Sequence, residues 1–181
     1  RVVVIDEPDD QPNAIAFIDP ASGDVERATT TCNAGSLPDE ISRNAVFALA
    51  DNSQDLYVTF GFFGTCVARG DLAAPAGAWL AAAVSDNGGL DPWPMIVGPE
   101  AVFVDFQGAI QAYDRDLGNA RTLLAEADVT YHLVEASDAG LLVVRTRQVG
   151  TPTSELWLVD PDTAKPIWTI DLGKSQLLAA V

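Results

Sequence analysis

Positive charge is scarce in this 181-residue chain, in which 10 lysines and arginines stand against 26 aspartates and glutamates. The formal net charge is −16, and the only lysines are Lys165 and Lys174. A nucleic-acid-binding protein needs a basic surface that neutralises phosphates. The composition therefore argues against nucleic acid as a partner. If the partner is a protein, the composition favours one with a basic surface.

Long apolar runs are missing as well. The longest nearly apolar stretch, residues 72–84, is interrupted by Pro75 and Gly77 and is shorter than the roughly 20 residues of a membrane-spanning helix. We therefore expect no transmembrane segment. The chain is nevertheless 48% hydrophobic, which is typical of a folded protein, and we expect a single domain over residues 1–181. Because it begins at Arg1 without methionine, we expect a processed chain or an excised segment.

Cysteine and histidine are too few for a zinc site, because the chain has two cysteines, one histidine and no C-x-x-C motif. Cys32 and Cys66 are compatible with one disulfide, and the alternative is two buried free thiols. A disulfide and scarce lysine together favour an extracytoplasmic location: secreted, periplasmic or cell-surface.

What the sequence does contain is a repeat. An alternating apolar run ending in aspartate, then a turn, then a second apolar run occurs around four residues that we call the marker aspartates: Asp19, Asp71, Asp114 and Asp160. They recur at steps of 52, 43 and 46 residues, close to the length of a four-stranded β-propeller blade, about 40 to 50 residues. Within the last three periods, the pattern predicts strands at Ala45–Leu49, Leu56–Phe62, Cys66–Arg69, Ala78–Ala83, Met95–Val97, Ala101–Asp105, Ala109–Asp114, Arg121–Glu126, Thr130–Ala136, Leu141–Arg147, Glu155–Asp160 and Pro166–Asp171. The strand at Ala78–Ala83 could equally be a helical turn, because alanine and leucine favour helix.

The two ends of the chain complement each other. Strands at Arg1–Ile5, Ala14–Asp19 and Asp24–Thr29 leave one blade a strand short, and Gln176–Val181 offers one more. We therefore expect an all-β fold, a propeller of about four blades closed by its N- and C-terminal strands. The alternative is half of a larger propeller, which would need a second propeller half as partner.

The phrases Ile18-Asp19-Pro20-Ala21-Ser22-Gly23 and Val159-Asp160-Pro161, the latter continuing to Trp168, resemble the repeat of quinoprotein-like (PQQ-like) β-propellers. The other two phrases are degenerate. The resemblance implies an aromatic residue docked between blades, for which Trp168 is the best match and Trp79 the second. It also implies a cofactor and calcium ion in the central funnel of quinone-dependent dehydrogenases. This chain lacks their vicinal cysteine pair, so the resemblance implies the fold and not the dehydrogenase activity.

Chemically active residues are sparse. His132 lies in an alternating strand, where an imidazole is usually structural. A serine–histidine–aspartate arrangement with Ser137 and Asp138 lacks the Gly-x-Ser-x-Gly motif that would support it. We therefore expect no catalytic residues and no bound cofactor.

Two acidic loops and one aromatic group are candidate binding sites. The loop with Asp86, Asn87 and Asp91 around two glycines could bind calcium, or form an ordinary connection between blades. The acidic stretch 6–10 could likewise bind calcium, or form an ordinary hairpin turn. Phe60, Phe62, Phe63 and Trp93 form either a binding patch or part of the core.

We therefore expect a non-catalytic extracytoplasmic propeller that binds another protein through its loops. The alternatives are part of a secreted propeller enzyme, a quinoprotein-like dehydrogenase or a hydrolase, and a calcium-dependent surface- or sugar-binding module.

Overall fold

The computed structural model describes residues 2–6, 14–29, 31–34, 37–40, 45–50, 54–60, 65–74, 77, 79–85 and 94–174. For residues 2, 5, 6, 31–34, 37–40, 65 and 82–85 it describes only the backbone. The described part contains strands and turns but no helix, and all its strand pairs are antiparallel. No helix in this part therefore has the length and hydropathy to span a membrane. The protein is all-β.

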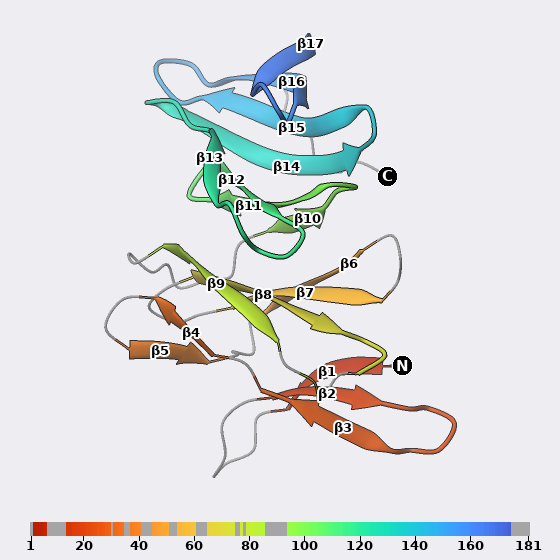
Figure 1. Ribbon diagram of the computed structural model, residues 1–181. Coiled ribbons are helices and arrows are strands. Elements are labelled where there is room, and N and C mark those ends of the chain that lie inside the picture. The colour runs from red at the N-terminus through yellow and green to blue at the C-terminus, as the bar shows by residue number, and fades with distance from the viewer. Residues whose placement is uncertain are drawn as a thin grey trace. The chain divides into compact units, whose positions relative to one another are not determined.

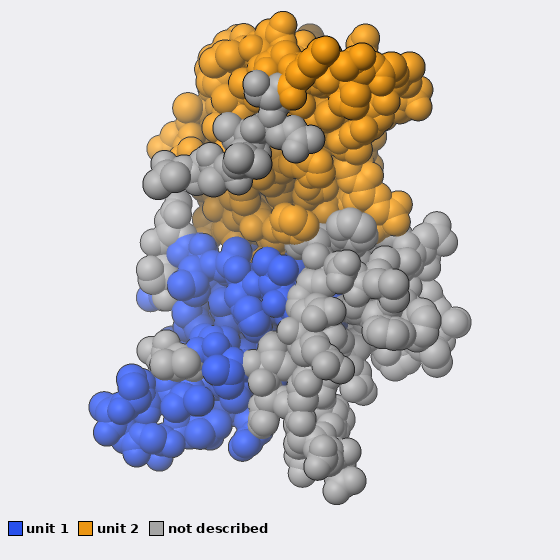
Figure 2. All heavy atoms as spheres, turned by 180° about the vertical axis from the view of Figure 1, so that it is seen from behind, with its two compact units in different colours: residues 1–93, 116–118 blue, residues 94–115, 119–181 orange. Residues whose placement is uncertain are grey.

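The chain divides into two compact units, residues 1–93 with 116–118 and residues 94–115 with 119–181 (Figure 2). The expectation of a single domain stays a prediction. The first unit holds a three-stranded sheet, a two-stranded hairpin and a four-stranded sheet (Figure 1). Sheet 1 is β1 (Val2–Asp6), β2 (Ala14–Ile18) and β3 (Val25–Ala28). The hairpin is β4 (Thr31–Ala34) and β5 (Leu37–Glu40), and sheet 2 is β6 (Val46–Leu49), β7 (Asp55–Phe60), β8 (Thr65–Asp71) and β9 (Leu80–Ser85).

The second unit holds two four-stranded sheets, each in simple up-and-down order. Sheet 3 is β10 (Met95–Val97), β11 (Ala101–Phe106), β12 (Ala109–Asp114) and β13 (Arg121–Leu124). Sheet 4 is β14 (Val129–Ser137), β15 (Gly140–Arg147), β16 (Thr153–Asp160) and β17 (Lys165–Gly173). In Figure 1, β17 is the strand of sheet 4 furthest from β14.

The predicted strands of sheets 2 to 4 are confirmed to within a few residues, and so are the three N-terminal strands. The doubtful strand at Ala78–Ala83 is a strand, β9, and not a helical turn. The β4–β5 hairpin was not predicted. The proposed closing strand, Gln176–Val181, lies outside the described residues, so closure of the sheets into a propeller stays a prediction.

The marker aspartates recur because they cap turns. Asp19 accepts a hydrogen bond on Oδ1 from the amide of Ala21 at 2.8 Å, and Asp71 accepts one from Ala73 at 2.7 Å. Asp160 does the same with Asp162 at 2.9 Å. Such turns satisfy backbone donors locally where the chain reverses. Asp114 departs from this pattern and accepts from the side chain of Asn119 instead.

Counting back from each marker separates the two faces of each sheet, because alternate strand residues face opposite sides and directly opposed residues share a side. We call the face with residues two and four before the marker the leading face. The face with residues one, three and five before it is the trailing face. In sheet 1, Phe17 and Ile15 are therefore on the leading face, and in sheet 2, Ala68 and Cys66 are on the trailing face.

Each unit has a core in which a leading face meets the trailing face of the next sheet. In the first unit, Ile15, Phe17 and Ala28 cluster with the trailing-face residues Leu56, Val58, Phe60, Cys66 and Ala68. In the second unit, the leading-face residues Phe103, Ile110 and Ala112 cluster with the trailing-face residues Tyr131, Leu141, Val143 and Val159. The same rule of packing thus holds in both units.

Candidate functional site

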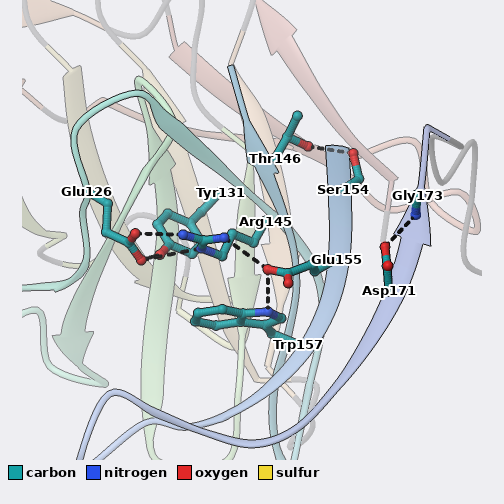
Figure 3. Close-up of polar contacts among 9 residues, drawn as sticks. All are labelled: Glu126, Tyr131, Arg145, Thr146, Ser154, Glu155, Trp157, Asp171 and Gly173. Atoms are coloured by element: carbon teal, nitrogen blue, oxygen red, sulfur yellow. Dashed lines mark hydrogen bonds and ion pairs between the residues drawn. The ribbon is translucent and has the colours of Figure 1, made fainter. Parts of the chain in front are cut away.

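The most extensive polar cluster in the described residues surrounds Arg145 on the trailing face of sheet 4 (Figure 3). Arg145 is only 8% exposed. Its Nη2 donates to Glu126 Oε2 at 2.7 Å, and its Nη1 donates to Glu155 Oε2 at 2.9 Å. The guanidinium also lies 4.9 Å from the ring centre of Trp157, a cation–π contact.

The neighbours of Arg145 are bonded to one another as well. Trp157 Nε1 donates to Glu155 Oε2 at 3.1 Å, and the Tyr131 hydroxyl donates to Glu126 Oε1. The rings of Tyr131 and Trp157 meet edge to face, with centroids 6.1 Å apart. Glu126 comes from the connection between β13 and β14, and the other residues come from three neighbouring strands of sheet 4. The cluster therefore ties the end of sheet 3 to sheet 4.

The pKa shifts in this cluster favour fixed protonation states. Hydrogen bonds from Arg145 and Tyr131 hold the pKa of Glu126 below its usual range. Burial, with the hydrogen bond to Glu126, raises the pKa of Tyr131 to about 12. The hydrogen bond to Glu126 raises the pKa of Arg145 as well. Near neutral pH, Glu126 is thus a carboxylate, Tyr131 a neutral phenol and Arg145 a cation, all joined by hydrogen bonds. Groups with such fixed protonation states are better suited to stabilising the fold than to proton transfer.

A second polar contact joins the same two sheets. Asp105 on β11 is 5% exposed, and its Oδ2 lies 2.9 Å from Nδ1 of His132 on β14. Burial raises the pKa of the Asp105 carboxyl, and the hydrogen bond with His132 opposes that shift. Nearby, the Tyr131 amide donates to the Gly108 carbonyl at 2.7 Å. The sequence had marked His132 as structural but gave no partner for it.

The structure does not bring Ser137 and Asp138 to His132. Ser137 ends β14 five residues after His132, a separation of roughly 17 Å along an extended strand. Its hydroxyl accepts a hydrogen bond from the Ala139 amide at 3.3 Å, as part of the hairpin turn. The serine–histidine–aspartate arrangement is therefore not assembled, and the carboxylate that does meet His132 is Asp105.

The leading face of sheet 4 is apolar and partly open. From β15 and β16 it carries Leu142, Val144, Leu156 and Leu158, and from β17 it carries Trp168 and Ile170. Trp168 is 40% exposed and Ile170 is 51% exposed. Sequence reasoning missed this surface: alternation along β15 and β16 indicates its centre, but the side on which Trp168 and Ile170 lie follows only from the pairing of β17 with β16.

A register shift explains why Trp168 lies on this face. Trp79 and Trp168 follow their markers at the same distance, but Trp79 lies against Phe17 of sheet 1, with ring centroids 6.3 Å apart. In β17, Val159 pairs with Pro166 and Leu158 with Trp168, so Ile167 is an extra residue. This β-bulge turns Trp168 to the opposite face. The aromatic docked between two sheets is therefore Trp79, the second match to the resemblance, whereas Trp168, the best match, lies on the partly open leading face of sheet 4.

The remaining predicted site residues are only partly within the description. Asp86, Asn87, Asp91, Phe62, Phe63 and Trp93 lie outside the described residues, so the calcium loop and most of the aromatic patch stay predictions. Phe60 is fully buried in the first core and is not part of an exposed patch. Within the described stretches, no group of three or more histidines, cysteines or carboxylates is arranged to hold a metal ion.

Cys66 is also fully buried in that core. Among the residues that the structure describes, no cysteine is free. The side chain of Cys32 lies outside the description, so the pairing of Cys32 with Cys66 stays a prediction.

Comparison with known proteins adds little. No protein-family model and no curated protein sequence matches the chain. A crystal structure of the tricorn protease is similar over 99% of this chain, with 9% identity and a TM-score of 0.43. The chain spans 22% of that protein's length. A similarity this low supports no conclusion about fold or function, and the quinoprotein-like family stays a prediction.

Proposed function

We propose that this chain is a non-catalytic scaffold of the β-propeller type, working in an extracytoplasmic compartment and binding another protein. The observation that carries the proposal is the repeated packing of a leading face on the next trailing face, seen once in each unit. Successive antiparallel up-and-down sheets that stack in this way are the building pattern of propellers. Such an array presents turns and strand edges from a rigid base.

Rigidity has a specific source in the second unit. The Arg145 cluster, the Asp105–His132 contact and the Tyr131–Gly108 backbone bond all cross between sheets 3 and 4 or their connections. The ionisable side chains Arg145, Asp105 and His132 therefore stabilise the packing of the two sheets. A preorganised surface loses less conformational entropy when it binds a partner.

An acidic edge of the second unit supports a basic partner. Arg121, at the start of β13, donates from Nη2 to the carbonyl of Pro161 at 2.9 Å, so the β12–β13 and β16–β17 turns are neighbours. Asp114 and Asp162 are exposed on these turns and Asp160 is half-buried, and Arg115, Arg121 and Lys165 lie on or beside the same turns. With a net charge of −16 for the chain, these aspartates would meet a basic surface in a field that attracts it and repels an acidic one.

The test is to identify a partner and then measure its charge dependence. The immobilised full chain would capture proteins from an extract at low ionic strength, and the captured protein would be purified for calorimetric titration. We expect a basic partner whose affinity falls as salt rises. Asp162→Asn should weaken binding about two- to fivefold, whereas Asp128→Asn, at the opposite end of sheet 4, should not. A partner with no salt dependence, or equal effects of both variants, would contradict the proposal.

A further inference from the structure

We infer that the leading face of sheet 4 binds the trailing face of sheet 1 in a second copy of this chain. The inference deepens the proposed function and rests on its blade-like packing, since it names one partner and the surface that takes it. The inference requires that these two faces, one in each unit, are complementary in shape and chemistry.

The first face is apolar at its centre. Leu142, Leu156 and Leu158 are half-buried on the leading face of sheet 4, and Trp168 and Ile170 extend it at the outer strand. Neither strand pair β15–β16 nor β16–β17 places a charged side chain among these five residues on that face. Polar groups on this face stand at its margins, with His132 and Glu135 on β14 and Asp160 and Lys165 at the turn. An apolar centre with a polar rim is typical of a protein interface.

The second face is the trailing face of sheet 1. Val4 and Arg27 both pair with Ala16, and Ile18 pairs with Val25, so all five share this face. Val4 is 38% exposed and Val25 is 45% exposed, Arg27 is exposed, and Ala16 is buried. Apart from Arg27, these side chains are aliphatic, and none is as large as Trp168 on the leading face of sheet 4. Large side chains packed on small ones give dense interfaces.

The packing within each unit indicates which face meets which. The leading face of sheet 1 packs on the trailing face of sheet 2, and the leading face of sheet 3 packs on the trailing face of sheet 4. Among the described sheets, sheet 4 is last in chain order and sheet 1 is first. A leading face of sheet 4 set on a trailing face of sheet 1 would therefore repeat an interface that the chain forms twice already.

A second copy fits better than the basic partner at this surface. The five side chains at the centre of the leading face are uncharged, so they offer nothing to a basic surface, and Asp160 of the acidic turns lies only at the margin of this face. Each copy carries both complementary faces. A head-to-tail contact of this kind is heterologous, and copies joined by it can close into a ring in which the interface occurs more than once. Repetition lowers the area that each single contact must bury.

The first experiment measures molecular mass against concentration by sedimentation, using the full chain. We expect the wild type to self-associate, and Trp168→Glu on one face and Val25→Asp on the other each to weaken association roughly tenfold or more. Val149→Asp is the matched control, because Val149 is 61% exposed but lies in the β15–β16 connection, on neither face. It should leave association unchanged. Far-UV circular dichroism establishes that each variant is folded, and Ile170→Glu replaces Trp168→Glu if that variant is not.

Mixing the two variants tests the direction of the contact. In a head-to-tail arrangement, Trp168→Glu retains an intact trailing face and Val25→Asp retains an intact leading face. Their mixture should therefore form mixed dimers that neither variant forms alone. A symmetric contact of like faces predicts no such rescue, and its absence would overturn the inference.

Salt separates this inference from the binding of a basic partner. Two copies with a charge of −16 each repel one another, so added salt should strengthen self-association. The same salt should weaken the binding of a basic partner. A wild type that stays monomeric at every concentration and salt would overturn the second-copy contact and leave the basic partner standing. Equal self-association of the wild type, Trp168→Glu and Val25→Asp would overturn it as well.

Discussion

At the scale of single residues, Arg145 shows how this chain uses its few cations. Its guanidinium is almost completely buried, yet two carboxylates and an indole ring surround it. A buried charge is tolerated only when it is paired and hydrogen-bonded. Arginine suits this position better than lysine, because its planar fork can bond two carboxylates while its face lies on an aromatic ring.

Replacing Arg145 with methionine should lower the free energy of unfolding by about 1–3 kcal/mol. Methionine keeps most of the volume but leaves Glu126 and Glu155 without their shared cation. Arg147→Met is the matched control on the same strand, because Arg147 is exposed, and its effect should stay within about 0.5 kcal/mol. Urea unfolding measures both, and equal losses would show that the cluster does not stabilise the fold.

Asp105 and Glu126 should give opposite pH dependences, because their pKa values shift in opposite directions. Burial raises the pKa of Asp105, so its contribution to stability is greatest below its unfolded pKa of about 4 and is lost as pH rises through the folded value. Hydrogen bonds from Arg145 and Tyr131 lower the pKa of Glu126. Its contribution is therefore present above about pH 4 and is lost as pH falls.

The measurement compares unfolding free energies of the wild type with Asp105→Asn and with Glu126→Gln across the acidic to neutral range. The wild-type advantage over Asp105→Asn should shrink as pH rises, and its advantage over Glu126→Gln should grow. If both differences in unfolding free energy changed in the same direction with pH, the surroundings described for either Asp105 or Glu126 would be wrong.

At the scale of elements, the strands follow from local rules. Alternating apolar residues and aspartate-capped turns placed most strands of sheets 2 to 4 correctly, because both signals act over a few neighbouring residues. The β4–β5 hairpin escaped prediction because its strands are short and Pro38 weakens a strand pattern. The partner of His132 also escaped it, since Asp105 is far away in the chain and meets His132 only when two sheets stack.

Register is the other property that local pattern does not determine. The sequence of β17 reads as one alternating strand, and nothing in it shows that Ile167 is an extra residue. The bulge appears only from the pairing with β16. It decides which face carries Trp168, because a shift of one residue moves every later side chain to the other side.

Deleting Ile167 should therefore remove the bulge and leave Trp168 opposite Leu158, on the leading face. With fluorotryptophan incorporated, the resonance assigned by Trp168→Phe reports solvent exposure through its shift between light and heavy water. We expect that shift to stay unchanged in the deletion variant, because Val159 still pairs with Pro166 and Leu158 still pairs with Trp168 once the extra residue is gone. Trp157, on the trailing face, provides the internal reference. A large change in the Trp168 shift would mean that Ile167 is not the extra residue.

At the scale of the molecule, the account depends on one rule, that within each unit the leading face of one sheet packs on the trailing face of the next. The fold class, all-β and antiparallel, could be predicted from the repeat. The exposed face of sheet 4 could not, because the side on which Trp168 lies depends on the bulge in β17. The scaffold function and the second-copy contact both extend this rule.

Methyl–methyl nuclear Overhauser measurements on the labelled full chain test the rule most directly. We predict contacts between the methyl groups of Ile110 on sheet 3 and those of Leu141 or Val143 on sheet 4, and none from Ile110 to Leu156 or Leu158. Contacts from Ile110 to Leu156 or Leu158, with none to Leu141 or Val143, would place the opposite face of sheet 4 against sheet 3 and contradict the account.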